Sequence, residues 1–200
     1  MTGRRVLLLG SSHICRLDKF MLQNKEYKNF NWRDDFELIQ TCLFGIGGGK
    51  ITSSRHCRRW EEKLSSERPD HLLVQFLGND LDDPELNIDL VHEISDKMVA
   101  MLTMWVQRYN LQKITICKLM PRASVRYADS VTHYNSMVMQ CNNYLEQLVQ
   151  SVPSWSLARL RGVSSELPAF HLLQDGVHLN NLGLKLYYRS IRGAILRMLA

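Results

Sequence analysis

Short apolar runs rich in β-forming residues alternate with longer amphipathic runs along the chain, and this alternation constrains the fold most. Strand-like runs fall at 5–9, 36–43, 72–77, 113–119 and 155–160. Apolar residues recur at helical spacing at 14–22, 53–64, 86–109, 133–149 and 182–199. The 72–77 run is apolar at almost every position, as in strands buried on both faces of a parallel sheet. The pattern therefore predicts an α/β fold with a parallel sheet covered by helices on both faces.

Length and composition fit one globular domain spanning residues 1–200. The chain is 45% hydrophobic and 22% charged, and its net charge of +5 permits an anionic partner without requiring one. The longest apolar stretch near the start, 6–9, is too short for a membrane span or a signal peptide. Five scattered cysteines without metal-binding spacing indicate reduced, mostly buried thiols. We therefore expect an intracellular protein, most simply a cytoplasmic one, without a transmembrane segment.

Two turns that follow predicted strands carry residues suited to anion binding, and ligands of parallel sheets bind at that edge. After the first strand, Ser11 and Ser12 precede a helix, whose first N–H groups attract negative charge; alternatively, one serine simply caps the helix. After the second strand, 45–49 reads Gly-Ile-Gly-Gly-Gly, which suits either an anion-binding nest or a flexible turn. Its spacing matches neither a dinucleotide fingerprint nor a P-loop.

Two further turns carry polar side chains. Asn79 follows the most buried strand and can donate amide hydrogens to an oxyanion, with Asp80 orienting the loop; Asn-Asp is also a common turn pair. Asp175 stands three residues before His178, near enough to fix its tautomer and leave Nε2 as a general base. The alternative is an ordinary Asp-Gly turn in which Asn180 caps the last helix.

All four turns fall at the predicted carboxyl edge of one sheet. They supply a serine, two candidate oxyanion sites and an Asp–His pair, in the chain order Ser, Asp, His that some hydrolases use. Each turn alone has an ordinary structural explanation, but together they form a complete hydrolytic set. The sequence therefore predicts a catalytic site.

In this order the four blocks resemble those of the SGNH (GDSL-type) hydrolases, esterases with a flavodoxin-like three-layer α/β/α sandwich. The resemblance extends over nearly the whole chain. It implies that Ser12 is the nucleophile and that Asp175 and His178 complete a catalytic triad. It also implies an oxyanion hole formed by the backbone N–H groups of Ser12 and Gly48 and by the Asn79 side chain.

Two positions depart from the family pattern. Ser11 stands where the family usually has the Asp that supports the nucleophile turn, and Leu77 stands at the glycine of the GxND block. A finer resemblance is to the intracellular esterase domains of animal LINE-type retroelements. It rests on the Gly-Ser-Ser-His start, the 175–180 block and the Met-Pro-Arg at 120–122. It implies action on short acyl esters, at a lipid or within an RNA–protein particle.

We therefore expect a serine esterase that hydrolyses short-chain, acetyl-like carboxylic esters through an acyl-enzyme, without a metal or organic cofactor. Simple esters, acetylated sugars and lysolipids remain alternative substrates, and the oligomeric state is open. The rival hypothesis is a catalytically weak module of the same fold that binds RNA or another anion. Its basic residues would be Arg55, His56, Arg58, Arg59, Arg189, Arg192 and Arg197. Against it, the net charge is modest and no RNA-reading aromatic motif is present.

Several other residues are interpreted as structural. His13 is expected to be a first-turn helix residue with a solvated or backbone-bonded ring, although a substitute base or rim residue is the alternative. Arg122 is expected to be a solvated loop residue, with contact to an acyl or phosphate group as the alternative, and His171 is expected to be structural. A helical stripe is assigned to the core: Met98, Met101, Leu102 and Trp105.

Overall fold

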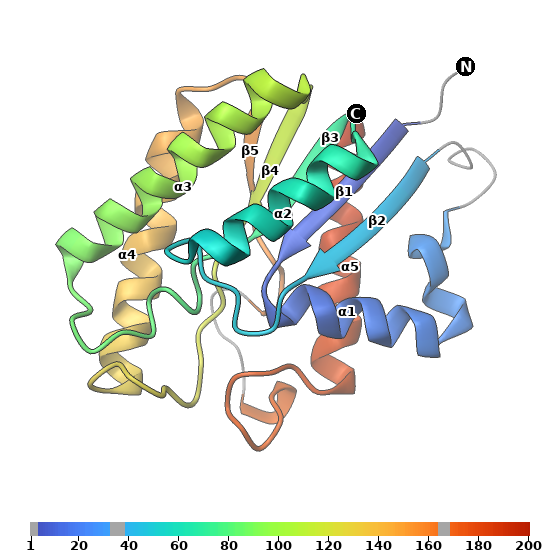
Figure 1. The fold of residues 1–200 in the computed structure, drawn as a ribbon. Coiled ribbons are helices and arrows are strands. Elements are labelled where there is room, and N and C mark those ends of the chain that lie inside the picture. The colour runs from blue at the N-terminus through green and yellow to red at the C-terminus, as the bar shows by residue number, and fades with distance from the viewer. Residues whose placement is uncertain (1–3, 33–38, 164–168) are drawn as a thin grey trace.

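A five-stranded parallel sheet forms the centre of the molecule (Figure 1). The computed structural model describes residues 4–32, 39–163 and 169–200. The strand order is β2-β1-β3-β4-β5, the flavodoxin-like order, which confirms the predicted α/β fold. The strands are β1 (Arg4–Gly10), β2 (Ile39–Gly45), β3 (His71–Gln75), β4 (Lys113–Cys117) and β5 (Trp155–Ala158). Positions 36–38 of the second predicted strand lie outside the described residues.

Five helices follow the predicted amphipathic runs. They are α1 (Ser12–Gln23), α2 (Ser54–Glu67), α3 (Ile88–Tyr109), α4 (Val131–Gln150) and α5 (Asn181–Leu199). The predicted cap of the last helix is confirmed, because the side chain of Asn180 accepts the N–H groups of Leu182 and Gly183. Two short 3-10 segments, Lys25–Asn31 and Ala169–His171, were not predicted.

Alternate residues of each strand pack against opposite helical layers, which makes the α/β/α sandwich. On β1, Leu7 and Leu9 join the core formed with α2, α3 and α4, whereas Val6 and Leu8 join the core formed with α1 and α5. The predicted stripe on α3 lies in the first core, with Met101 only partly buried. Burial of each such leucine contributes about 1.5–3 kcal/mol, so the two cores stabilise the packing of the helices on both faces of the sheet.

The cysteines agree only in part with the expectation of mostly buried thiols. All five cysteines are unpaired; Cys117 and Cys141 are buried, and the other three are half-buried. Among the described residues, no helix is both long enough and apolar enough to cross a membrane.

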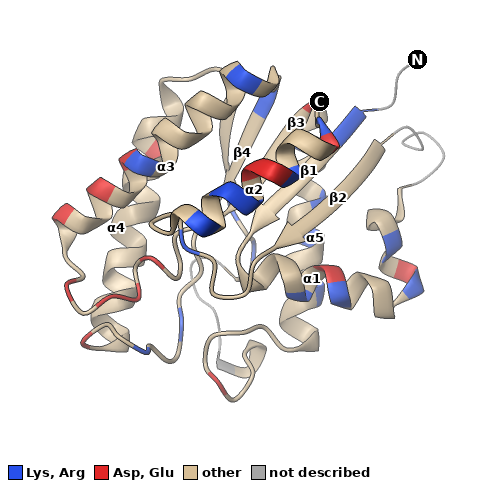
Figure 2. Cartoon of the chain, in the orientation of Figure 1, with Lys and Arg blue, Asp and Glu red and all other residues tan. Residues whose placement is uncertain are grey.

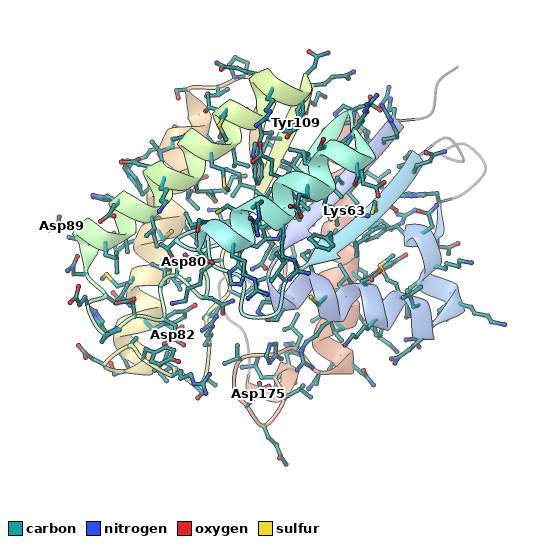
Figure 3. All side chains as sticks on the ribbon, viewed as in Figure 1. Lys63, Asp80, Asp82, Asp89, Tyr109 and Asp175 are labelled. Atoms are coloured by element: carbon teal, nitrogen blue, oxygen red, sulfur yellow. The ribbon has the colours of Figure 1, made fainter. Side chains whose placement is uncertain are left out.

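Strand register brings the predicted site loops together. Gly10, the last residue of β1, lies opposite Gly45 of β2 and opposite Gln75 of β3. These three strands therefore end level, and the turns that follow them meet at one edge. Figure 3 shows Asp175 at the lower end of the molecule and Tyr109 near the upper end, with Asp80 between them.

Candidate active site

The nucleophile candidate stands at the junction of β1 and α1. A side chain at Gly10 would come within 2.9 Å of the Gln75 carbonyl, so only glycine permits this close turn. Ser11 occupies the N-cap position but makes no capping hydrogen bond, and its hydroxyl lies 3.4 Å from Gln75 Oε1. The Ser12 hydroxyl lies 2.9 Å from Nε2 of His178. The capping alternative therefore does not describe either serine side chain.

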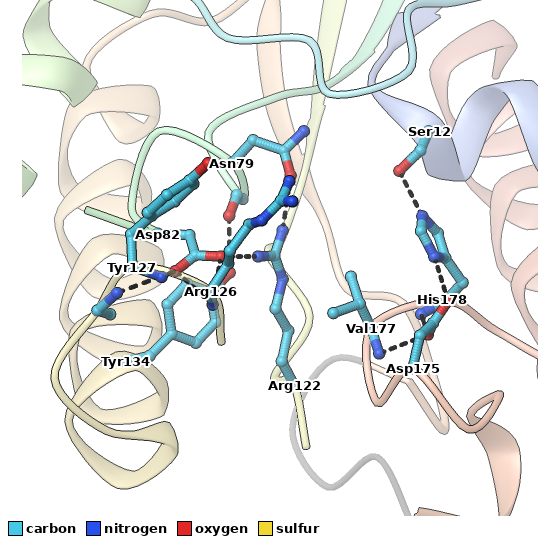
Figure 4. Close-up of polar contacts among 12 residues, drawn as sticks. Ser12, Asn79, Asp82, Arg122, Arg126, Tyr127, Tyr134, Asp175, Val177 and His178 are labelled. Atoms are coloured by element: carbon cyan, nitrogen blue, oxygen red, sulfur yellow. Dashed lines mark hydrogen bonds and ion pairs between the residues drawn. The ribbon is translucent and has the colours of Figure 1, made fainter. Parts of the chain in front are cut away.

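The loop before α5 holds the Asp–His pair in a tight turn. Asp175 Oδ1 accepts the backbone N–H groups of Val177 and His178 at 2.9 and 2.8 Å, and its Oδ2 lies 2.7 Å from His178 Nδ1. Gly176 between them has φ +66°, the left-handed region that glycine adopts readily. Figure 4 shows the resulting line of contacts from Asp175 through His178 to Ser12.

The charge of Asp175 sets the tautomer of the histidine. Burial opposes ionisation, but hydrogen bonds from the His178 backbone and ring and from Val177 outweigh it and lower the pKa of Asp175 to about 2. The ionised carboxylate requires a hydrogen on Nδ1 of His178, which leaves Nε2 to accept the Ser12 proton. This is the arrangement that a general base needs.

Hydrogen bonds join the glycine-rich turn and the residues that follow it to the Asn79 turn. Asp80 accepts hydrogen bonds from the N–H groups of Ile51 and Thr52 and from the Thr52 hydroxyl at 2.9–3.2 Å. Burial raises the pKa of Asp80, although these hydrogen bonds act against the rise. One residue earlier, Asn79 Nδ2 donates to the Gly49 carbonyl at 3.1 Å. The two predicted oxyanion elements therefore form one unit.

Gly48 adopts the backbone conformation that its proposed role needs. Its φ is +67°, and its N–H group has no hydrogen-bond acceptor within the described part of the chain. The N–H group is therefore available to an anion at this turn.

Arg122 is not the solvated loop residue that the sequence suggested, and this expectation is wrong. Its side chain is 7% exposed, donates to Asp82 at 3.2 Å and to Asn79 Oδ1 at 2.9 Å, and lies 5.0 Å from the ring centre of Tyr134 (Figure 4). Asp82 also accepts the backbone N–H groups of 126–128. Burial opposes its ionisation, but these hydrogen bonds and the Arg122 charge lower the pKa of Asp82. The buried carboxylate of Asp82 compensates the charge of Arg122, which allows the arginine to be buried.

The segment 121–128 closes the site between the Asn79 turn and the Asp–His loop. At one end Ala123 donates to the Gly176 carbonyl at 2.7 Å, and at the other the 126–128 backbone binds Asp82. No motif in the sequence predicted these contacts, because the partners of the segment are 44 to 53 positions away. Within this segment, the sequence singled out only Pro121 and Arg122.

His13 packs beside the candidate base, and its predicted solvated or backbone-bonded ring is wrong. The ring is buried, with its centre 5.7 Å from that of His178 and 6.4 Å from that of Tyr187. Its Nδ1 has no hydrogen-bond partner among the described residues. Burial, followed by the charges of Arg122 and His178, lowers the pKa of His13 to about 3. The ring is therefore neutral at ordinary pH. His171, also expected to be structural, is buried.

The basic residues of the rival hypothesis are partly engaged within the protein. Arg58 lies 3.7 Å from Glu62, and the Arg59 guanidinium lies 5.8 Å from the Phe44 ring centre. Arg192 donates to the Phe30 carbonyl at 2.9 Å. Figure 2 shows acidic and basic residues close together on α2. This helix does not present a uniform cationic face.

The fold is shared with solved esterase structures at low sequence identity. A GDSL-like lipase from Bacteroides thetaiotaomicron is 16% identical, with a TM-score of 0.70, over 97% of this chain and 88% of the other. The esterase EstA from a Pseudoalteromonas species is also 16% identical, with a TM-score of 0.68, over 98% of each chain. A catalytic mutant of an acetylxylan esterase from Geobacillus stearothermophilus is 14% identical, with a TM-score of 0.58, over 98% of this chain and 94% of the other.

The sequence comparisons are negative. No family model and no curated protein matches the chain. The structural similarities give no support to the finer resemblance to retroelement esterase domains. They show that the chain has the three-layer fold of the GDSL/SGNH hydrolases.

Proposed function

We propose that this protein is a serine esterase that hydrolyses short-chain carboxylic esters. The proposal rests chiefly on the unbroken line of hydrogen bonds from Asp175 through His178 to Ser12, at 2.7 and 2.9 Å. A serine hydroxyl is a weak nucleophile until an adjacent base can remove its proton, and this arrangement supplies that base. Acetyl and acetylxylan esterases share the fold, which favours acetyl-like acyl groups.

In the proposed reaction, His178 removes the proton of Ser12 as Oγ attacks the acyl carbonyl carbon. The tetrahedral oxyanion receives hydrogen bonds from the N–H groups of Ser12 and Gly48 and from Asn79 Nδ2. Asp175 stabilises the imidazolium. As the intermediate collapses, the C–O bond to the alcohol breaks and His178 protonates the leaving oxygen. Water, deprotonated by the same ring, then releases the acid and restores Ser12. The side chains, these backbone N–H groups and water supply every step.

Turnover of p-nitrophenyl acetate tests the proposal. The parent should release p-nitrophenol at a Ser12-dependent rate, and Ser12→Ala should lower kcat by roughly 10⁶, as nucleophile loss does in a well-studied serine hydrolase. Ser11→Ala is the matched control, since the one hydrogen bond of its hydroxyl among the described residues is to Gln75 at 3.4 Å. We expect it to retain activity within about tenfold, because that long hydrogen bond contributes little. Equal rates for the parent and Ser12→Ala would contradict the proposal.

The rival binding function predicts a different result. RNA would be retained, the retention would fall steeply with salt, and Ser12→Ala would leave it unchanged. Salt-dependent retention together with Ser12-independent ester turnover would favour the binding module over the esterase.

A further inference from the structure

We infer that Arg122 is a positioning residue that aims the Asn79 amide at the oxyanion. The inference deepens the proposed function and rests on it. It starts from a contact that the sequence did not predict, the 2.9 Å hydrogen bond from Arg122 Nη2 to Asn79 Oδ1.

This contact fixes which way the Asn79 amide faces. An arginine side chain can only donate hydrogen bonds, so the atom of Asn79 that faces it must be the oxygen. The nitrogen then faces the opposite way, where it donates to the Gly49 carbonyl at 3.1 Å. An amide nitrogen carries two hydrogens, and the Gly49 carbonyl takes one. The second is left for an oxyanion beside the glycine-rich turn.

Arg122 is itself held rigidly, which a positioning residue requires. Its Nη1 donates to Asp82, and its guanidinium lies over the Tyr134 ring. The Tyr134 hydroxyl donates to the carbonyl of Gly78 at 2.9 Å, so the ring beneath the guanidinium also holds the residue before Asn79. The planar fork of arginine serves Asp82 and Asn79 with separate nitrogens, which a lysine ammonium on its flexible stem does not reproduce.

The charge adds to the orientation. A cation at the carbonyl end of an amide polarises it and makes its N–H groups stronger donors, and this effect is larger where water is excluded. Arg122 is 8% exposed, and its charge is balanced by Asp82 rather than by solvent. The Asn79 N–H should therefore stabilise an oxyanion more than an unassisted amide would.

A double-mutant cycle with Asn79→Ala tests the inference, using kcat and KM for p-nitrophenyl acetate. In the parent, Arg122→Met should lower kcat about 10- to 100-fold, the factor expected when a charge-assisted hydrogen bond no longer acts in the transition state. KM should change less than about threefold, since the oxyanion forms after binding. In the Asn79→Ala background the same change should alter kcat less than about twofold.

Two further variants keep the test decisive. Arg122→Lys should recover only part of the lost kcat, because one ammonium cannot serve Asp82 and Asn79 as the fork does. Asp82→Asn removes the anion that holds Arg122 but keeps an oxygen for the 126–128 N–H groups. It should lower kcat in the parent and have little effect in the Asn79→Ala background, even if Arg122→Met does not fold.

The outcomes separate this inference from the proposed function. A parent that lacks Ser12-dependent turnover would overturn both. A parent with Ser12-dependent turnover, in which Arg122 and Asp82 changes lower kcat equally with and without Asn79, would overturn the positioning role alone. So would an Arg122→Met variant that folds and keeps the parent kcat.

Discussion

The two sides of the site are built in different ways. The nucleophile side comprises Ser12 and the Asp–His loop, and the carboxylate, the turn and the imidazole of that loop fall within four consecutive residues. The oxyanion side comprises Asn79, Arg122 and Asp82, and its key contacts join residues 40 and 43 positions apart. The first side is half-exposed at its carboxylate, whereas the cation and the anion of the second are buried.

The backbone differs as well. Ser11, before the nucleophile, has φ −87°, an ordinary value. Leu77, before the Asn79 turn, has φ +71°, and the N–H of Gly78 donates to the Phe76 carbonyl across it at 3.0 Å. Such a three-residue turn is strained for a residue with a side chain. The comparison teaches that local hydrogen bonds place the carboxylate and the imidazole relative to each other. Tertiary packing brings that pair to Ser12, 166 positions away, and also places the electrostatic support of the oxyanion side.

Loss of the base should have the largest effect on activity. His178→Ala should lower kcat by roughly 10⁶, about as much as loss of the serine, since the two groups act as a unit. Asp175→Asn should cost roughly 10⁴, because an amide no longer imposes the required tautomer. Ester turnover of purified variants measures both. A variant of either residue with near-parent kcat would break the assignment of the nucleophile side.

Loss of the oxyanion donor should have a smaller effect. Asn79→Ala should lower kcat by about 10²–10³ and leave a measurable remnant, because backbone N–H donors remain. The same turnover assay measures it, with Asn142→Ala as a control, because both ends of that buried amide bind the Leu119 backbone and neither contacts Asn79 or Arg122. If Asn79→Ala is as active as the parent, the oxyanion side is wrongly assigned.

His13 packs beside His178 and should make stability depend on pH. Its pKa is 6.5 in an unfolded chain and about 3 in the fold. The stability that this shift contributes is complete above about pH 6.5 and is lost as the pH falls from 6.5 toward 3, because the unfolded chain binds the proton first. Urea unfolding at pH 7 and pH 4.5 should show a smaller loss of unfolding free energy for His13→Phe than for the parent.

A matched control is His92→Phe, on α3 and only partly buried. It should keep the parent's pH dependence. The same loss of unfolding free energy in His13→Phe and in the parent would show that the buried ring is not the cause. Burial also lowers the pKa of His71, so part of the dependence should persist in every variant.

The smallest expected effect is a difference in stability between two variants of Leu77, in the strained turn before Asn79. Leu77 is 1% exposed, so both Leu77→Ala and Leu77→Gly should destabilise the protein by a few kcal/mol. Glycine normally costs about 0.5–1 kcal/mol more than alanine, but at φ +71° it relieves strain of about 1 kcal/mol. The glycine variant should therefore be at least as stable as the alanine variant in chemical denaturation.

The control pair is Leu86→Ala and Leu86→Gly, at a buried loop position without positive φ. There the glycine variant should be less stable by about 0.5–1 kcal/mol. If the Leu77→Gly variant were also less stable than Leu77→Ala, Leu77 would carry no strain.

These contrasts explain what the sequence could predict. Hydrophobic periodicity located the five strands and five α-helices of the described residues, because strands buried on both faces and helices with one apolar face leave period-specific patterns. It could not locate the Lys25–Asn31 segment, which has no such period and contains non-helical φ and ψ values.

Within the site, short motifs identified Ser12, Asn79 and the Asp–His loop. The contacts inside that loop are local, and strand register brings the Ser12 and Asn79 turns to one edge of the sheet. Arg122 and His13 were misjudged because each is buried by partners far along the chain, Asp82 for the first and Tyr187 for the second. A single arginine or histidine in a polar turn carries no sequence sign of such partners.

The central claim is that His178 activates Ser12, and covalent labelling with a fluorophosphonate tests it most directly. Intact mass and peptide mapping would be compared for the parent, Ser12→Ala and His178→Ala after identical incubations. We predict one adduct in the parent, located on Ser12, none in Ser12→Ala and much slower labelling in His178→Ala. A folded parent that gains no adduct, or gains it at another residue, would contradict the account.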